Sequence, residues 1–213
     1  ISISIITGLE ELLKSKNISG KLQIKWPNDI FLNHKKIGGI LIENSISFNG
    51  IEQSIIGIGL NINELNFPSN LKLATSLKNE FSQINWDKKD VLSKICHTLE
   101  KNYNLLFSEE SIINKKTYFQ YLLGYGEKRL YKIDNKKVTA QIIDIDNHGR
   151  LMLQYEDASI HYFGMKEIEF LFTHFFRGEN SIGKRGSGLG LVIVKRIFEI
   201  HQEILEPQNR FNI

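Results

Sequence analysis

Residues 21–63 constrain the fold more than any other part of the sequence, because apolar and polar residues alternate there and turn signals interrupt them at short intervals. The alternation over residues 21–26 ends at Pro27, and further turn signals follow at residues 33–35 and at Asn49-Gly50. A period of two is typical of strands with one buried face, and Asn-Gly is a strong signal for a tight turn. These residues therefore predict consecutive antiparallel strands.

Three segments carry apolar residues at helical spacing. The first is residues 1–16, which have one apolar face. The second follows Asp87, which has the character of a helix N-cap, and the third is residues 109–122. Helices with one apolar face need a partner to cover it. We therefore expect an α+β fold, in which helices pack on a mixed, largely antiparallel sheet.

A second group of short strands is predicted after Gly124 and Gly126. Residues 138–145, 151–155 and 160–163 read as strands separated by tight turns. Several short strands joined in this way predict a small β-barrel, which would end near residue 172.

Composition excludes several classes of protein. The 213 residues carry a net charge of only +3, which is too weak to indicate a nucleic-acid partner. The single cysteine, Cys96, excludes an internal disulfide and fits a reducing compartment, so we expect a cytoplasmic protein. No apolar run approaches the roughly 20 residues of a membrane span, so no membrane association is predicted.

The predicted strands carry a concentration of residues suited to anion chemistry. A lysine and an acid near glycines can place opposite charges over bare backbone that a ligand can approach closely. The candidate residues are Lys25, Trp26, Asn28, Asp29, Lys36, Gly38, Gly39, Gly57, Gly59 and Asn61.

Each of these residue types also has an ordinary structural interpretation, and the sequence alone leaves both open. The structural alternatives are a solvated charge for either lysine, turn chemistry for Asn28 and Asp29, a β-bulge for Gly38 and Gly39, a strand cap for Asn61 and core packing for Trp26.

The three motifs that carry these residues occur in the order and approximate spacing of the catalytic core of biotin–protein ligases, and the chain resembles that family. The motifs are Lys25-Trp26-Pro27-Asn28-Asp29-Ile30, Lys35-Lys36-Ile37-Gly38-Gly39-Ile40-Leu41 and Gly57-Ile58-Gly59-Leu60-Asn61-Ile62-Asn63. The resemblance implies a fold like that of class II synthetases and biotin ligases, with a small C-terminal barrel. It also implies ATP-dependent activation of biotin to biotinyl-adenylate, and transfer of biotin to a lysine of the biotin carboxyl carrier protein.

The resemblance also implies roles for individual residues. Lys36 is the best candidate for the cation that stabilises the reacting anions, with Lys25 as the second cation. Asp29 would orient the nucleotide, bind Mg²⁺ or fix Lys36. The remaining candidates would bind biotin or ATP, with the glycines providing close approach and Asn61 an amide.

Family members also carry segments that these residues lack. A glycine- and arginine-rich loop over the adenylate and, in some members, a DNA-binding module precede the region where this sequence begins. We therefore expect a truncated core with low ligase activity and no nucleic-acid partner. Members of the family often pair, so a homodimer, or a non-catalytic dimerising scaffold, is an alternative expectation.

Residues 173–213 have a different character. They resemble the ATP-lid region of sensor histidine kinases, in which Gly186, Gly188 and Gly190 would contact phosphate. This resemblance gives the alternative of a nucleotide-binding kinase fragment, although the upstream kinase motifs are absent. We expect an appended fragment, and hence three regions: a partial catalytic domain at 1–122, a barrel at 123–172 and the tail at 173–213.

Overall fold

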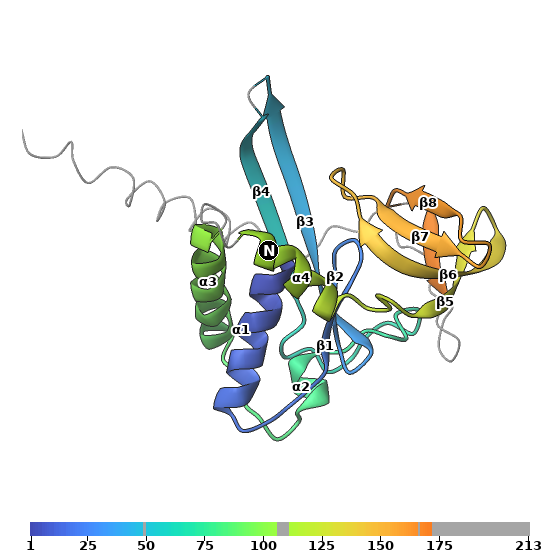
Figure 1. Cartoon of the computed structure of the whole chain (residues 1–213). Helices are drawn as coiled ribbons and strands as arrows, with labels where there is room; N and C mark the ends of the chain where they lie inside the picture. Colours follow the sequence, from blue (N-terminus) through green and yellow to red (C-terminus); the bar gives the residue numbers. More distant parts are fainter. Residues whose placement is uncertain (49, 106–110, 166, 172–213) are drawn as a thin grey trace, which may run out of the picture.

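The computed structural model describes residues 1–48, 50–105, 111–165 and 167–171, which form two antiparallel sheets and their helices (Figure 1). The tail, with its predicted phosphate-binding glycines, lies outside the described residues. The larger sheet has the strand order β1-β2-β3-β4, and all its pairs are antiparallel, which confirms the prediction for residues 21–63. Its strands are β1 (Leu22–Lys25), β2 (Asp29–Leu32), β3 (Lys35–Ser47) and β4 (Gly50–Leu60).

The helices also fall where the sequence predicts them. They are α1 (Ser2–Ser15), α2 (Leu77–Glu80), α3 (Lys88–Leu105) and α4 (Ser111–Tyr121). Asp87 caps α3, since its carboxylate accepts a hydrogen bond of 2.8 Å from the backbone N–H of Lys89. Of the helices that the structure describes, only the short α2 was not predicted. Its N-cap is Ser76, whose hydroxyl accepts a hydrogen bond from the N–H of Asn79 at 3.0 Å.

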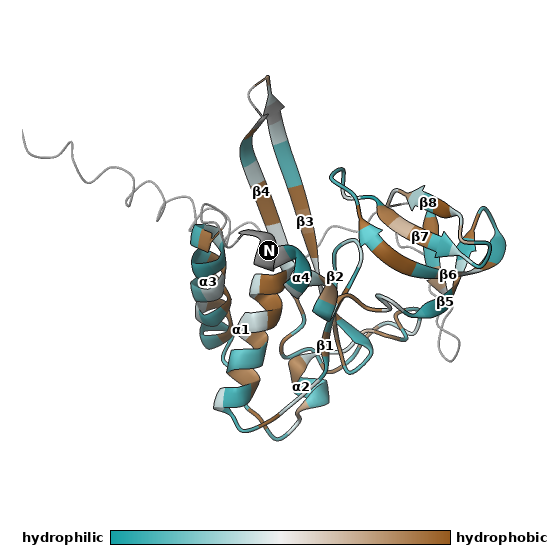
Figure 2. Ribbon diagram, in the orientation of Figure 1, coloured by the Kyte–Doolittle hydropathy of each residue, from teal (hydrophilic) through white to brown (hydrophobic). Residues whose placement is uncertain are grey.

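One face of the larger sheet is buried against α1. Alternate residues of the strands, including Ile24 and Ile30, form a single apolar core with Ile5 and Leu9 of the helix. Figure 2 shows the matching hydrophobic stretches along α1, β3 and β4. Side chains repeat every two residues along a strand and every 3.6 residues along a helix, so each element has one apolar face. The opposite face of the sheet is not covered by α1.

Strands β2 and β3 are joined by a two-residue turn. Asn33 and His34 have φ angles of 50° and 66°, in the left-handed region that a type I′ hairpin turn requires at both central positions. The strands β3 and β4 extend beyond the body of the molecule as a long two-stranded arm (Figure 1).

The smaller sheet consists of β5 (Lys128–Ile133), β6 (Lys136–Ile145), β7 (Leu151–Tyr155), β8 (Ile160–Phe163) and β9 (Ile168–Leu171). Its strand order is β8-β7-β6-β5-β9. Buried residues from all five strands share one core, including Tyr131, Ile142, Leu153, Phe163 and Phe170. Among the described residues β8 and β9 do not pair, so the predicted closed barrel is replaced by an open five-stranded sheet whose strands share this one core.

The two sheets meet at the end of β1. The Trp26 ring belongs to the core of the smaller sheet, and its Nε1–H donates to the carbonyl of Gly149 at 3.1 Å. Next to it, Ile24 forms an isolated parallel bridge with Leu122, just before the smaller sheet begins. The smaller sheet is therefore fixed next to the residues that the sequence singles out as functional.

Candidate functional site

The exposed face of the larger sheet carries a row of four residues in direct cross-strand register. Lys25 pairs with Asp29, Asp29 with Gly39, and Gly39 with Gly59. Residues that pair in this way present their side chains on the same face of a sheet. The row therefore places a cation and a carboxylate beside two adjacent positions without side chains, where the backbone is open to a ligand.

Lys36 reaches this row because of a β-bulge. Ile30 pairs with Gly38 but Phe31 pairs with Lys36, so Ile37 is an extra residue in β3. Without the bulge, Lys36 would lie on the buried face together with Gly38, since successive side chains alternate between faces. The bulge instead turns Lys36 toward Asp29.

The three charged side chains form one cluster. The Lys36 Nζ lies 2.5 Å from Asp29 Oδ1, and the Lys25 Nζ lies 4.0 Å from Asp29 Oδ2. The Lys36 side chain is 45% exposed, whereas those of Lys25 and Asp29 are 21% and 19% exposed. Lys36 is thus directly engaged by the acid and open to solvent, whereas Lys25 is more enclosed and lies farther from Asp29.

The enclosure of Lys25 changes its electrostatics. Burial lowers the pKa of the Lys25 amine below its ordinary value; Asp29 opposes this shift, Lys36 adds to it and Glu169 opposes it. The amine also lies 6.0 Å from the ring centroid of Phe31 and 5.6 Å from that of Phe170. Aromatic faces at these distances attract the ammonium group and so stabilise its charged form.

The predicted glycines divide into two groups. A Cβ at Gly39 would meet neighbouring atoms only at ordinary distances, the nearest being Asp29 Oδ1 at 3.5 Å, and one at Gly59 would meet only a backbone oxygen at 4.0 Å. A Cβ at Gly38 would lie 2.5 Å from the carbonyl oxygen of Gly59. Gly38 is buried and allows β3 and β4 to approach, whereas Gly39 and Gly59 leave open space; Gly57 lies two residues along the same face.

Three other predicted site residues have structural hydrogen bonds. The Asn28 amide donates to the carbonyl of Ile40 at 2.7 Å and thereby holds the β1–β2 loop against β3. The Asn61 amide donates to the carbonyl of Thr75 at 3.0 Å. Trp26 packs in the core of the smaller sheet.

The sequence did not reveal the segment that supports Lys36. The Lys36 N–H donates to the carbonyl of Leu73 at 2.7 Å, and its carbonyl accepts the N–H of Thr75 at 2.9 Å. Residues 73–75 thus run beside β3 and hold the Lys36 backbone on both sides. The sequence carries no local signal for this contact, because it depends on a loop that returns to the sheet.

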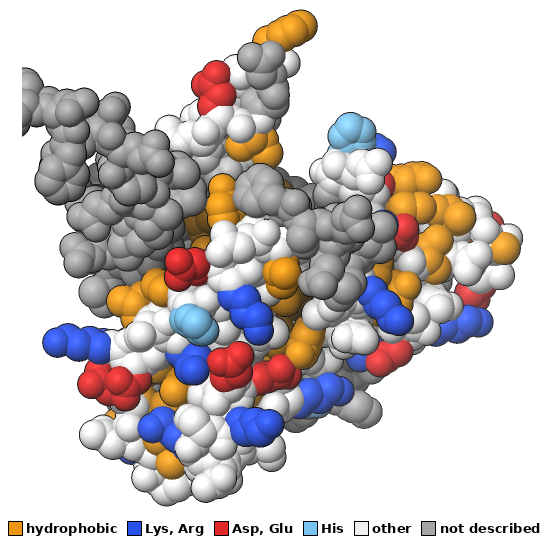
Figure 3. All heavy atoms as spheres, turned by 60° about the vertical axis from the view of Figure 1, so that its left-hand side comes forward, with side chains coloured by type: hydrophobic (Ala, Val, Ile, Leu, Met, Phe, Trp, Pro, Cys, Tyr) orange, Lys and Arg blue, Asp and Glu red, His pale blue; other side chains and the backbone are white. Residues whose placement is uncertain are grey.

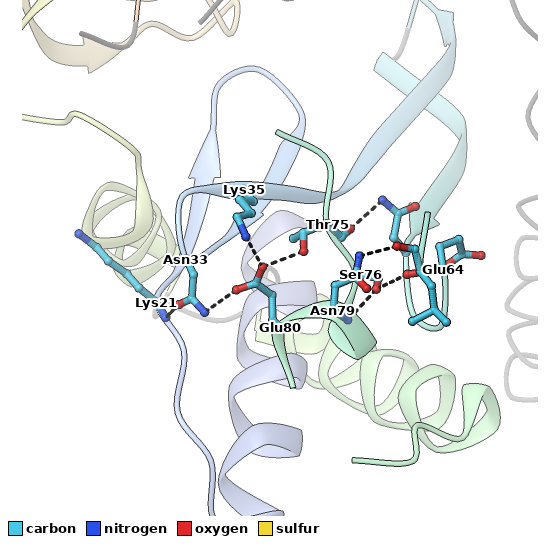
Figure 4. A network of polar contacts seen from close by, with 10 residues as sticks. Lys21, Asn33, Lys35, Glu64, Thr75, Ser76, Asn79 and Glu80 are labelled. Carbon is cyan, nitrogen blue, oxygen red and sulfur yellow. Dashed lines mark hydrogen bonds and ion pairs between the residues drawn. The ribbon is translucent and has the colours of Figure 1, made fainter. Parts of the chain in front are cut away.

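Glu80 anchors this segment through the polar network in Figure 4. Its carboxylate accepts hydrogen bonds from Thr75 Oγ1 at 2.7 Å, Asn33 Nδ2 at 2.9 Å and Lys35 Nζ at 3.1 Å. Burial raises the pKa of Glu80, but these hydrogen bonds outweigh burial and lower the pKa overall. Glu80 therefore joins α2, the β2–β3 turn and the segment that supports Lys36.

Other kinds of site receive no support from the described residues. No group of three or more His, Cys, Asp or Glu side chains gathers among them to hold a metal ion, so Asp29 offers a single carboxylate. None of the helices that the structure describes is long and apolar enough to cross a membrane. Basic and acidic side chains are interspersed on the face shown in Figure 3. A shallow hollow in the smaller sheet, beside Tyr155 and Gln141, includes no residue of the charged cluster.

The sequence is similar to those of known ligases. Residues 1–61, which contain the whole row, match the model of the Biotin/lipoate A/B protein ligase family. The chain is 31% identical over 160 residues to the bifunctional ligase/repressor BirA of Bacillus subtilis, covering 74% of this chain and 47% of that protein. It is 48% identical over 44 residues to the biotin–[acetyl-CoA-carboxylase] ligase of Paracoccus denitrificans, covering 21% of this chain and 18% of that protein. The chain therefore spans about half the length of the BirA proteins that it matches.

Comparisons of structure also find biotin protein ligases. The apo biotin protein ligase of Aquifex aeolicus matches with a TM-score of 0.61 and 26% identity, over 80% of this chain and 72% of that one. The same ligase in complex with biotin and ATP matches with a TM-score of 0.57 and 26% identity, over 79% and 70%. The described residues thus have the mixed α+β fold of biotin protein ligases.

Proposed function

We propose that this chain is a biotin–protein ligase that activates biotin with ATP and transfers it to a lysine of a carrier protein. The row Lys25–Asp29–Gly39–Gly59 is the observation that carries the proposal. It combines a cation, an acid and open backbone on the exposed face of a sheet. The family match over residues 1–61 and the solved ligase that binds biotin and ATP support this assignment.

The chemistry explains why such a row is needed. In the first step a carboxylate oxygen of biotin attacks the α-phosphorus of ATP, the bond to the bridging oxygen breaks, and pyrophosphate leaves. Two anionic groups must approach each other, so a fixed positive charge lowers the barrier. In the second step the acceptor amine attacks the acyl carbon of the adenylate, an amide bond forms, AMP leaves, and the amine loses a proton.

We propose a different order of importance for the two lysines from the order that the sequence suggested. Lys36 is ion-paired with Asp29 at 2.5 Å and is about half exposed, so much of its charge is already neutralised. Lys25 lies 4.0 Å from the acid and is more enclosed. A cation in a less hydrated site interacts more strongly with an anion that enters it. Lys25 is therefore the better candidate to contact the reacting anions, and Lys36 holds Asp29 in place.

Asp29 is the residue that would contribute to a Mg²⁺ site. Mg²⁺ takes oxygen ligands and commonly binds through one or two carboxylates together with substrate phosphates and water, so a single carboxylate fits this use. Bound Mg²⁺ would neutralise phosphate charge. Gly39 and Gly59 would admit the ligand close to the backbone, while Asn28 keeps the loop that carries Asp29 in register with β3.

The partners follow from the same reaction. The acceptor is a biotin carboxyl carrier protein, which presents the lysine amine. A homodimer remains a prediction, supported by β4 as an edge strand of its sheet and by the exposed apolar side chains Leu41, Ile42, Ile51 and Ile55 on the β3–β4 arm.

The test is an assay of biotinyl-adenylate formation and of acceptor labelling with ATP, Mg²⁺ and labelled biotin. We expect Lys25→Ala to lower the rate of adenylate formation by about 100-fold or more, because a preorganised charge at the transition state is lost. Lys36→Ala should have a smaller effect, on the order of 10-fold. The same assay measures how active this chain is.

Lys94→Ala is the matched control. Lys94 is 36% exposed and pairs with Glu11 at 3.2 Å between α3 and α1, away from the row. Its removal should leave the rate unchanged. Wild-type protein that forms no adenylate, or a Lys25→Ala variant as active as Lys94→Ala, would refute the proposed function.

A further inference from the structure

The smaller sheet contacts the charged cluster directly through strand β9. The ring centroid of Phe170 lies 5.6 Å from the Lys25 Nζ, and Phe170 itself is only 5% exposed. The neighbouring Glu169 opposes the loss of charge at Lys25 that burial causes. Residues nearly 150 positions apart in the sequence thus contribute to the surroundings of one amine.

Strand β9 is itself firmly placed. Phe170 pairs with Tyr131 of β5 in the sheet register, and their rings meet edge to face with centroids 5.3 Å apart. Glu169 pairs with Lys132, and their side chains are 3.4 Å apart. A rigid platform of this kind fixes a neighbouring side chain better than a loop would.

The larger sheet is attached to this platform at the residue after Lys25. Trp26 inserts its ring into the core of the smaller sheet and donates a hydrogen bond to Gly149. Trp26 follows the last residue of β1, so the contacts that bury Trp26 also fix the backbone next to Lys25.

We propose that Phe170 of the smaller sheet is a positioning residue for Lys25, assisted by the charge of Glu169 on the same strand, and that the smaller sheet thereby forms part of the ligase site. The importance of Lys25 for catalysis rests on the proposed function. The aromatic face holds the ammonium group in the cluster, and the negative charge of Glu169 favours the protonated amine. Among the described residues, the charges that act on Lys25 include Asp29 from β2, Lys36 from β3 and Glu169 from β9, and the Glu169 side chain itself pairs with Lys132 from β5.

The experiment compares Phe170→Leu and Glu169→Gln with the wild-type chain. Leucine keeps apolar bulk but removes the ring that faces the cation, and glutamine removes only the charge. The first measurement is the pKa of Lys25 by NMR of carbon-13-labelled lysines, with the signal assigned by Lys25→Arg. Both variants should lower this pKa, because each removes a group that favours the charged amine.

Phe163→Leu is the control, because Phe163 belongs to the same apolar core but lies on β8. It should destabilise the sheet to a similar extent and leave the pKa of Lys25 unchanged. A pKa that stays at the wild-type value in both Phe170→Leu and Glu169→Gln, or that shifts equally in Phe163→Leu, would overturn the proposal. Glu169 is 43% exposed, so its variant should fold even if Phe170→Leu does not.

The second measurement is the pH profile of adenylate formation. We expect kcat to fall about three- to tenfold in Phe170→Leu, and the alkaline limb of the profile to move to lower pH in both variants. The NMR titration does not require activity. A chain that forms no adenylate but shows the predicted titrations would therefore refute the ligase assignment and leave the contact between the sheets standing.

Discussion

The two faces of the larger sheet are built from the same strands but have opposite roles. On one face Ile30 and Gly38 are buried in the core that α1 covers. On the other face Asp29 and Gly39, each the next residue along its strand, belong to the row with Lys25. The difference teaches that a motif such as Gly38-Gly39 is not one functional unit, because consecutive residues of a strand face different surroundings.

Substitutions at the two adjacent glycines test most directly whether the two faces have different roles. Gly38→Ala places a methyl group 2.5 Å from the Gly59 carbonyl, which should reduce the free energy of unfolding by about 3 kcal/mol. Gly39→Ala has no such contact and should leave stability unchanged or raise it by up to about 1 kcal/mol. Urea unfolding of the two variants measures this difference.

In the adenylation assay we expect Gly39→Ala, the variant with the smaller effect on stability, to have the clear effect on activity. Gly39→Ala should lower kcat/KM about tenfold, because the methyl group occupies the backbone surface that a ligand would approach. Equal stability losses in the two variants would show that the faces are not distinct in the way that the register indicates.

Two acids sharpen the comparison further. Glu80 accepts three hydrogen bonds and its side chain is only 9% exposed, so Glu80→Gln should cost about 2 kcal/mol of stability. Asp29 lies on the exposed face between two lysines, so Asp29→Asn should cost less than about 1 kcal/mol but should abolish most of the activity. Thermal unfolding and the adenylation assay, run on both variants, separate these roles.

The effect of Glu80 should also depend on pH. Its pKa is lowered in the folded protein from the ordinary value of 4.5, so the unfolded state binds the proton more readily. The stabilisation is therefore present above pH 4.5 and is lost as the pH falls through the folded pKa. The difference in stability between wild type and Glu80→Gln should narrow over that acidic range, and a constant difference would contradict the assignment.

The smallest expected effect concerns the contact between the two sheets. Trp26→Phe keeps an aromatic ring in the core of the smaller sheet but removes the hydrogen bond to the Gly149 carbonyl. We expect a loss of about 1 kcal/mol in urea unfolding. Phe119→Leu, a change at a partly buried ring of the same core on α4, serves as a comparison without a hydrogen bond. No loss of stability in Trp26→Phe would show that this hydrogen bond contributes little to the contact between the two sheets.

Local pattern was sufficient for most of the secondary structure. The alternation before Pro27 and the N-cap at Asp87 are signals that act over a few residues, and the structure confirms the strands and the helix that they predict. The closed barrel was less predictable. Short strands with tight turns occur in open sheets as well as in barrels, and closure depends on whether the first and last strands meet.

The sequence predicted that some candidate residues would lie close together, but it did not predict their geometry. Lys25, Asp29 and Lys36 come together as the motifs predict, because hairpins bring neighbouring strands into contact. The roles of Asn28 and Trp26 were not predictable, since both depend on hydrogen bonds to backbone carbonyls, of Ile40 and of Gly149. Glu80 gave no signal, because its three donors come from separate segments.

The sequence by itself determined which residues form strands and which charges lie near open backbone, since both follow from patterns that span a few positions. Only the tertiary structure decided which face each residue occupies and how strongly it is enclosed. A single extra residue at Ile37 turns Lys36 from the buried face to the row. A strand from the second sheet brings Phe170 to Lys25. Register and long-range packing are properties of the folded chain as a whole, so local pattern does not encode them.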